Sequence, residues 1–153
     1  MYKRILVAID GSDTANKALA AAVHLAKEVK GQVRLVHVIE ELAYLTGFDQ
    51  YGGYAADLIK IMRDTGNEIL EGGMALARAA GVEADSMLYD NTGERLADVM
   101  ADAAKRWNAD LIVVGTHGRR GIGRILMGSG AEQIIALAPV PVLVIRSSTA
   151  PEH

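Results

Sequence analysis

The chain has 153 residues, of which 50% are hydrophobic and 23% are charged, and it contains no cysteine. This length and composition fit one globular domain and exclude a disordered chain. The net charge of −3 provides no basic field for nucleic acid or anionic membranes, and the missing thiols exclude disulfides and cysteine metal sites. We expect one domain at 1–147 and a flexible tail at 148–153. No apolar run is long enough for a signal peptide or a membrane span, so we expect the protein to be cytoplasmic.

Five short runs rich in Val, Ile and Leu predict strands, in chain order at 5–9, 33–39, 82–89, 111–115 and 140–146. The first, fourth and fifth runs are continuously apolar, which is typical of parallel strands buried on both faces. Apolar stripes with helical spacing lie between the runs, at Ala18, Ala22, Leu25 and Val29; Leu58, Met62, Thr65, Ile69, Leu76 and Ala80; Leu96, Val99, Met100, Ala103 and Trp107; and Ala131, Ile134, Ile135 and Ala138. The alternation predicts an α/β fold, a single-domain open five-stranded parallel sheet with helices on both faces.

Several residues indicate where these helices begin and end. Gly81 is expected just beyond the second helix, Pro139 closes the fourth, and Thr92 is expected to cap the third. The Gly72-Gly73 pair is expected to weaken the second helix by roughly 1 kcal/mol per glycine relative to alanine.

The connection at 40–54 is unusually long for a compact α/β domain. It contains three of the five tyrosines and the single phenylalanine. Such a segment is expected either to bind a partner or to pack its own aromatic side chains on the surface.

Glycines and polar residues follow two of the predicted strands. Asp10-Gly11-Ser12 follows the first strand, the glycine- and arginine-rich segment 115–124 follows the fourth, and Gly128-Ser129-Gly130 opens the fourth helix. Ligands of open α/β sheets bind beyond the carboxyl ends of the strands. Glycines let backbone N–H groups approach an anion, and a helix amino terminus adds donors and a positive dipole end. The pattern favours a phosphate or nucleotide site.

Each of these features also has a purely structural explanation. Ser129 and Glu132 have the spacing of a capping box, and the arginines at 119, 120 and 124 can be solvated loop residues. Asp10-Gly11 can form a turn before a helix cap at Ser12 or Asp13. His37, between two valines, is expected to be a hydrogen-bonded histidine of the sheet.

Other nucleotide and phosphate folds fit the residues less well. The chain lacks G-x-x-x-x-G-K-[ST], and therefore the lysine of a Walker A site. A dinucleotide fingerprint should follow the first strand, whereas this glycine segment follows the fourth. A receiver domain needs a lysine at the end of the fifth strand, where residues 145–147 read Ile-Arg-Ser.

The ionisable residues do not indicate an efficient enzyme. The four histidines, at 24, 37, 117 and 153, are too scattered for a local metal pair. Asp10 and His117 are the candidates to activate a water, and Asp10 beside phosphates is a reasonable Mg²⁺ ligand. We expect at most weak ATP hydrolysis.

The glycine spacing resembles a known family. Gly115-x-x-Gly118, nine further residues and Gly128-Ser129 match the G-2x-G-9x-G-(S/T) signature of the nucleotide-binding universal stress proteins. The segments at 4–12, 36–38 and 139–146 are also similar to that family, so the resemblance covers nearly the whole chain. It implies the strand order 3-2-1-4-5 and a homodimer paired through the last strand, at 140–146.

The resemblance also implies a ligand and its site. ATP, or AMP or ADP, would lie across the carboxyl ends of strands one and four, with the adenine beside strand two. We expect neither nucleic acid nor a membrane as a partner. The residues placed at the site are Ala8, Ile9, Asp10, Val38, Val114, Gly115, His117, Gly118, Arg119, Gly128, Ser129 and Gly130. Many relatives have proline where this chain has Ala8, so the shape beside the adenine is expected to differ.

The expected function is that of a nucleotide-dependent stress-response or regulatory factor, in which the phosphates order residues 116–130 beside the last strand. The alternatives are a slow ATPase, a protein that binds another phosphate-containing effector, and a scaffold whose partner binds the 40–54 segment.

Overall fold

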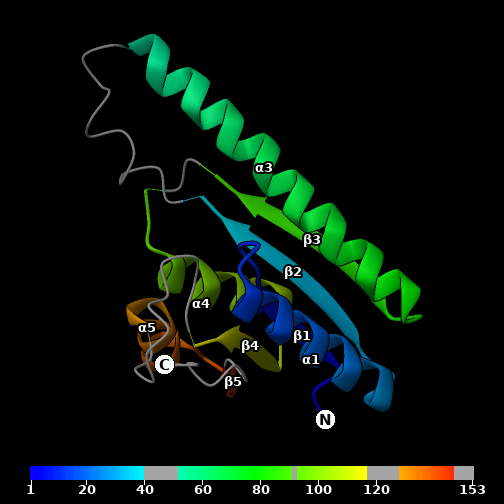
Figure 1. Ribbon diagram of the computed structural model, residues 1–153. Coiled ribbons are helices and arrows are strands. Elements are labelled where there is room, and N and C mark those ends of the chain that lie inside the picture. Colours follow the sequence, from blue (N-terminus) through cyan, green and yellow to red (C-terminus); the bar gives the residue numbers. More distant parts are fainter. Residues whose placement is uncertain (40–51, 91–92, 117–127, 147–153) are drawn as a thin grey trace, which may run out of the picture.

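The computed structural model describes residues 1–39, 52–90, 93–116 and 128–146, and the side chains from residue 57 onward in the second range (Figure 1). Its elements are β1 (Arg4–Ala8), α1 (Asp13–Val29), β2 (Gln32–Val38), α3 (Gly52–Ala79), β3 (Glu83–Tyr89), α4 (Leu96–Trp107), β4 (Leu111–Gly115), α5 (Ser129–Leu137) and β5 (Val142–Ile145). The strands pair in parallel in the order β3-β2-β1-β4-β5. The expected α/β fold is confirmed, and each predicted strand lies within about two residues of its observed bounds.

The sheet has a hydrophobic core on each face. Val7 and Leu35 belong to the core under α1 and α3, whereas Leu6 and Ile112 belong to the core under α4 and α5. Successive side chains of a strand point to opposite faces, so a continuously apolar strand such as β1 supplies both cores. No helix in the described part of the chain is both long and apolar enough to cross a bilayer.

α3 is a helix of 28 residues that runs along β2 and β3 and extends beyond them at its amino-terminal end (Figure 1). Its buried line consists of Gly66, Leu70, Gly73 and Ala77. Leu76, which the sequence pattern placed on the inward stripe, is 42% exposed, so that assignment is wrong. The helix lies so close to the sheet that small residues occupy much of the contact. A prediction based on the spacing of large apolar residues therefore assigns a neighbouring face of the helix to the core.

The two adjacent glycines of α3 have different surroundings. A Cβ atom at Gly73 would overlap Leu35 Cδ2, whereas a Cβ at Gly72 would meet no atom within 4 Å. The expected weakening therefore applies to Gly72, while Gly73 allows the helix to approach the sheet.

The helix ends agree only in part with the expected caps. Gly81 lies beyond α3 with a φ of +74°, as expected. α4 is preceded by Arg95, which makes no side-chain cap, while Thr92 lies outside the described residues. The capping box of Ser129 is wrong, because Gly128 is the N-cap of α5 and Ser129 is its first helical residue. The bond from the Gly128 N–H to the Thr116 carbonyl, 2.7 Å long, fixes this start.

The 40–54 connection is shorter than the sequence indicated. α3 already begins at Gly52, so residues 52–54 are helical, and residues 40–51 lie outside the described part of the chain. Ile135 is a second correction to the helical stripes, because this side chain of α5 is 44% exposed.

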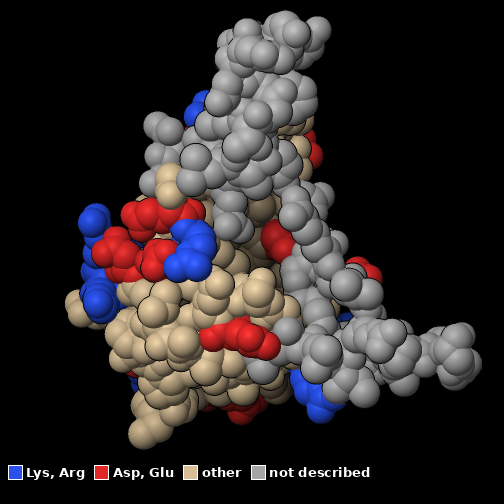
Figure 2. All heavy atoms as spheres, turned by 90° about the vertical axis from the view of Figure 1, so that its left-hand side faces the viewer, with Lys and Arg blue, Asp and Glu red and all other residues tan. Residues whose placement is uncertain are grey.

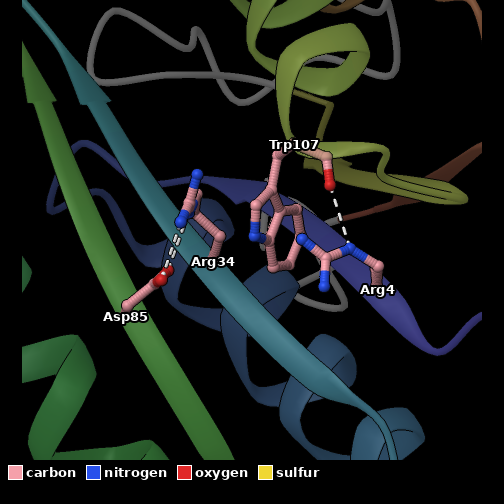
Figure 3. A network of polar contacts seen from close by, with 4 residues as sticks. All are labelled: Arg4, Arg34, Asp85 and Trp107. Carbon is pink, nitrogen blue, oxygen red and sulfur yellow. Dashed lines mark hydrogen bonds and ion pairs between the residues drawn. The ribbon is translucent and has the colours of Figure 1, made fainter.

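A cluster of charged and aromatic side chains joins the strands near their amino ends (Figure 3). Arg34 donates two hydrogen bonds of 2.7 Å to the carboxylate of Asp85, which raises the pKa of the guanidinium. The guanidinium carbons of Arg4 and Arg34 lie 4.4 and 4.7 Å from the ring centroid of Trp107. Arg4 Nε also donates to the carbonyl of Trp107 at 2.9 Å. These contacts connect β1, β2 and β3 to the end of α4.

Candidate functional site

The predicted site residues that the structure describes lie at the carboxyl edge of three adjacent strands. Ala8 ends β1, Val38 ends β2 and Gly115 ends β4, while Gly128 and Ser129 begin α5. β1 lies between β2 and β4, so these ends meet at one edge. The chain leaves β1 toward β2 and leaves β4 toward β5, in opposite directions, which makes this edge the switch point of the sheet.

Three of the predicted residues are not placed by the structure. His117, Gly118 and Arg119 lie outside the described residues, as does the rest of the segment at 117–127. The geometry of the site is therefore described from the ends of β1 and β2, the end of β4 and the start of α5.

The turn after β1 is held by side-chain hydrogen bonds. Asp10 Oδ1 accepts the N–H of Ser12 at 2.9 Å, and Ser12 Oγ accepts the N–H of Ala15 at 3.2 Å, which caps α1. Gly11 between them has a φ of +85°, in the left-handed region that favours glycine. The expected βα turn with a cap at Ser12 is confirmed, and it presents the half-buried Asp10 at the switch point.

The end of β4 packs directly against the start of α1. A Cβ at Gly115 would lie 2.6 Å from Thr14 Cγ2 and 3.0 Å from the Thr14 carbonyl oxygen. Gly115 therefore has a packing role that is independent of any ligand. Thr116, which follows it, donates its N–H to the Ile145 carbonyl at 3.0 Å and holds the end of β4 beside the end of β5.

The start of α5 differs from the start of α1 in its capping. Ser12 caps α1 with its hydroxyl, whereas Gly128 has no side chain to offer α5, and no cap bond from the N-cap side chain is formed there among the residues that the structure describes. The first N–H groups of a helix have no partner within the helix, and the dipole places partial positive charge beside them. This end is chemically suited to an anion such as phosphate.

Two of the predicted site residues have side chains in the core. Ile9 is 4% exposed and belongs to the core under α1 and α3, and Val114 is 3% exposed and belongs to the core under α4 and α5. Only their backbone atoms can face a ligand at this edge. Ala8 and Val38 are only partly buried against the core under α4 and α5, so their side chains leave some apolar surface at this edge.

The packing around Gly130 does not require glycine, because a small side chain would also fit there. A Cβ there would lie 3.7 Å from Leu96 Cδ2, an ordinary van der Waals distance, and this side of the residue faces α4. A contact from Gly130 to a ligand would therefore use its backbone.

His37 is the histidine that the sequence placed in the sheet, and the structure confirms its hydrogen bond. Nδ1 lies 2.8 Å from the carbonyl oxygen of Ile9, and the side chain is 8% exposed. The bond joins β2 to the residue that precedes Asp10, a connection that the sequence did not indicate.

The described residues contain no group of three or more His, Cys, Asp or Glu side chains placed to hold a metal ion. Asp10 can therefore serve Mg²⁺ only together with oxygens from another source, such as the phosphates of a nucleotide.

Comparisons with known proteins give a consistent result. The model of the universal stress protein family matches residues 1–146. Universal stress protein YxiE of Bacillus subtilis is 37% identical over 151 residues, with 95% of this chain and 100% of the relative covered. Universal stress protein MJ0531 of Methanocaldococcus jannaschii is 32% identical over 146 residues, with 95% of this chain and 83% of the relative covered.

Solved structures with related sequences have the same fold as this chain. A protein from the universal stress protein family of Burkholderia pseudomallei superposes with a TM-score of 0.78 at 33% identity, covering 95% of this chain and 97% of that one. The universal stress protein from Archaeoglobus fulgidus in complex with dAMP superposes with a TM-score of 0.69 at 28% identity, covering 94% and 98%. On the family match and these relatives, the chain belongs to the universal stress protein family.

Proposed function

We propose that this protein binds an adenine nucleotide, ATP being the first candidate, at the carboxyl edge of β1 and β4. The observation that carries the proposal is the convergence of the Asp10 turn, Gly115 and the uncapped start of α5 at one switch point. The Archaeoglobus fulgidus relative, whose structure holds dAMP, supports an adenine nucleotide as the ligand class. The protein would act as a nucleotide-dependent stress-response or regulatory factor in the cytoplasm.

In this proposal each part of the edge contacts a different part of the ligand. Ala8 and Val38 offer apolar surface to the adenine, and the Asp10 carboxylate accepts hydrogen bonds from the ribose. The N–H groups that open α5 at Ser129, together with the glycine positions 118 and 128 of the family spacing, would receive the phosphates. Mg²⁺ bound by phosphate oxygens would neutralise their charge, and the Asp10 carboxylate would be a further oxygen ligand for it.

We also propose that two copies pair through β5. This strand is an edge of the described sheet, because it hydrogen-bonds to β4 alone in the order β3-β2-β1-β4-β5. Leu143 on β5 is 39% exposed, and Ile135 and Leu137 on α5 are 44% and 45% exposed. Figure 2, which views the side where Figure 1 places α5, shows a largely uncharged area beside a cluster of charged side chains. An edge strand flanked by exposed apolar residues is suited to pairing with a second copy.

Calorimetric titration of nucleotide-stripped protein with Mg-ATP tests the ligand. We expect a dissociation constant in the micromolar range or below, equivalent to about −8 kcal/mol or better. The absence of heat at two temperatures would contradict the proposal. The 40–54 segment would then become the first surface to test, by substitution of its aromatic residues.

A further inference from the structure

His37 is a buried ionisable side chain that none of the proposed nucleotide contacts uses. It lies on β2 opposite Leu88 of β3, on the face covered by α1 and α3. Its Nδ1 atom lies 2.8 Å from the carbonyl oxygen of Ile9. A carbonyl oxygen only accepts hydrogen bonds, so Nδ1 must bear the proton and donate it.

This hydrogen bond fixes more than one residue. The Ile9 carbonyl and the Asp10 N–H belong to the same planar peptide group, so a bond that orients one also orients the other. The N–H of Ile9 donates to the Val36 carbonyl at 2.9 Å. β2 therefore holds Ile9 through both its N–H and its carbonyl, and it sets the direction in which the chain enters Asp10.

The ordering continues from Asp10 into α1. The Asp10 carboxylate accepts the Ser12 N–H at 2.9 Å, and the Ser12 hydroxyl accepts the Ala15 N–H at 3.2 Å. His37, the Ile9–Asp10 peptide, the Asp10 carboxylate and the α1 cap thus form one connected series of hydrogen bonds.

The opposite edge of the imidazole ring is held by α3. A Cβ at Gly66 would lie 2.7 Å from His37 Cδ2 and 3.2 Å from His37 Nε2, so glycine is what lets the helix lie on the ring. α3 also approaches the turn itself, because a Cβ at Gly11 would lie 3.2 Å from Ile69 Cδ1. The ring is confined between the helix and the Ile9 carbonyl and has little freedom to turn away.

We propose that His37 is a positioning residue of the nucleotide site, whose Nδ1–H orients the Ile9–Asp10 peptide and so sets the Asp10 carboxylate in place before the ligand binds. The inference rests on the proposed nucleotide function. It differs from a role in packing alone, since a packing role needs the volume of the ring and does not need its donor.

Two substitutions separate the donor from the volume. Asparagine in His37→Asn has an amide nitrogen at the same number of bonds from Cα as Nδ1, whereas leucine in His37→Leu has no donor. We expect His37→Leu to weaken Mg-ATP binding at least tenfold and His37→Asn to remain within about threefold of wild type. Equal weakening by both variants, or wild-type affinity in His37→Leu, would overturn the inference.

Amide hydrogen exchange gives a second readout that needs no nucleotide. The Ser12 amide, bonded to Asp10, should exchange at least tenfold faster in His37→Leu than in wild type or His37→Asn, while the core amides of Val7 and Leu35 keep their protection. Unchanged Ser12 exchange would overturn the inference. If wild-type protein binds no ATP, the proposed function fails, and the Ser12 amide still decides whether His37 orders the turn.

Nitrogen-15 NMR of the histidine ring in wild-type protein tests the inference even if the leucine variant does not fold. The proposal requires a hydrogen on Nδ1 of His37, the ring nitrogen that faces the Ile9 carbonyl oxygen. A ring with hydrogen on Nε2 alone cannot donate to Ile9 and would overturn the inference without any substitution.

Discussion

The two ends of the sheet differ in what their polar groups contact. At the amino end, Arg34 is paired with Asp85 and stacked on Trp107, so charged side chains are satisfied by other side chains (Figure 3). At the carboxyl ends of β1 and β4, by contrast, the Asp10 carboxylate accepts a backbone N–H, and Gly128 provides no side-chain cap to α5, while an ion pair between Asp90 and Arg63 lies farther along this edge, after β3. We therefore expect substitutions at the amino end to change mainly stability and, if the proposed function holds, substitutions at the carboxyl ends of β1 and β4 to change mainly ligand binding.

The strongest way to break the amino end is to remove its aromatic centre. Trp107→Ala deletes a side chain that is 7% exposed and that contacts two guanidinium groups. We expect the free energy of unfolding in urea to fall by about 3–5 kcal/mol, while the folded variant binds Mg-ATP as wild type does. A fall below about 1 kcal/mol, or lost ATP affinity in a fully folded variant, would contradict the division between the two ends.

The matching change at the carboxyl end should affect binding instead. Replacing Gly118 and Gly128 together by leucine is expected to raise the dissociation constant for Mg-ATP more than 100-fold, about 2.8 kcal/mol. Gly128 has φ −68° and ψ 155°, which any residue adopts, so leucine at this position should change the unfolding free energy little. Gly72→Leu is the control, because that position is open and lies on α3. Wild-type affinity in the double variant would remove the phosphate-binding assignment.

The adjacent glycines of α3 separate the effect of packing from the effect of helix propensity. Gly73→Ala should lower the unfolding free energy by about 1–3 kcal/mol, because the added methyl group meets Leu35. Gly72→Ala should raise it by up to about 1 kcal/mol, because alanine favours the helix and nothing lies nearby. Chemical unfolding of both variants measures the difference, and a change of the same sign in both would show that α3 does not lie on the sheet as described.

The smallest effect is expected from the ion pair of the amino end. Asp85→Asn removes the charge that pairs with Arg34, but the side chains are 52% and 22% exposed. Solvent screening limits the expected loss of unfolding free energy to about 1 kcal/mol or less, and about 1 M salt should reduce it further. A loss that persists in high salt and equals or exceeds that of Trp107→Ala would mean that the amino end depends on this charge as much as on the aromatic ring.

The fold could be predicted because three of its strands are continuously apolar and the turn after β1 is local. Asp10-Gly11-Ser12 could be assigned to a capped turn from three adjacent residues. The glycine contacts of α3 could not be predicted, since Gly66 and Gly73 have no side chain to enter a hydrophobic pattern. Leu76 was therefore placed inward, although it is 42% exposed.

The site was predictable only in part. Its residues were assigned through the glycine spacing and the resemblance to a family, and their meeting at one edge depends on the strand order. His37 and Ile9 are 28 residues apart, and their hydrogen bond follows from the register of β1 with β2. The N-cap of α5 was misassigned, although its start near Ser129 was predicted, because Ser129 and Glu132 fit a local rule whereas the contact of Gly128 with Thr116 is not local.

The most direct measurement is an NMR titration of the nitrogen-15-labelled protein with Mg-ATP, which follows both ends of the sheet in one experiment. We predict the largest amide shifts at the carboxyl edge, at Asp10, Ser12, Val38, Gly115 and Ser129, and no significant shifts around Arg34, Asp85 and Trp107. Shifts centred on the amino end, or saturation of the protein with no shift at the carboxyl edge, would contradict the account.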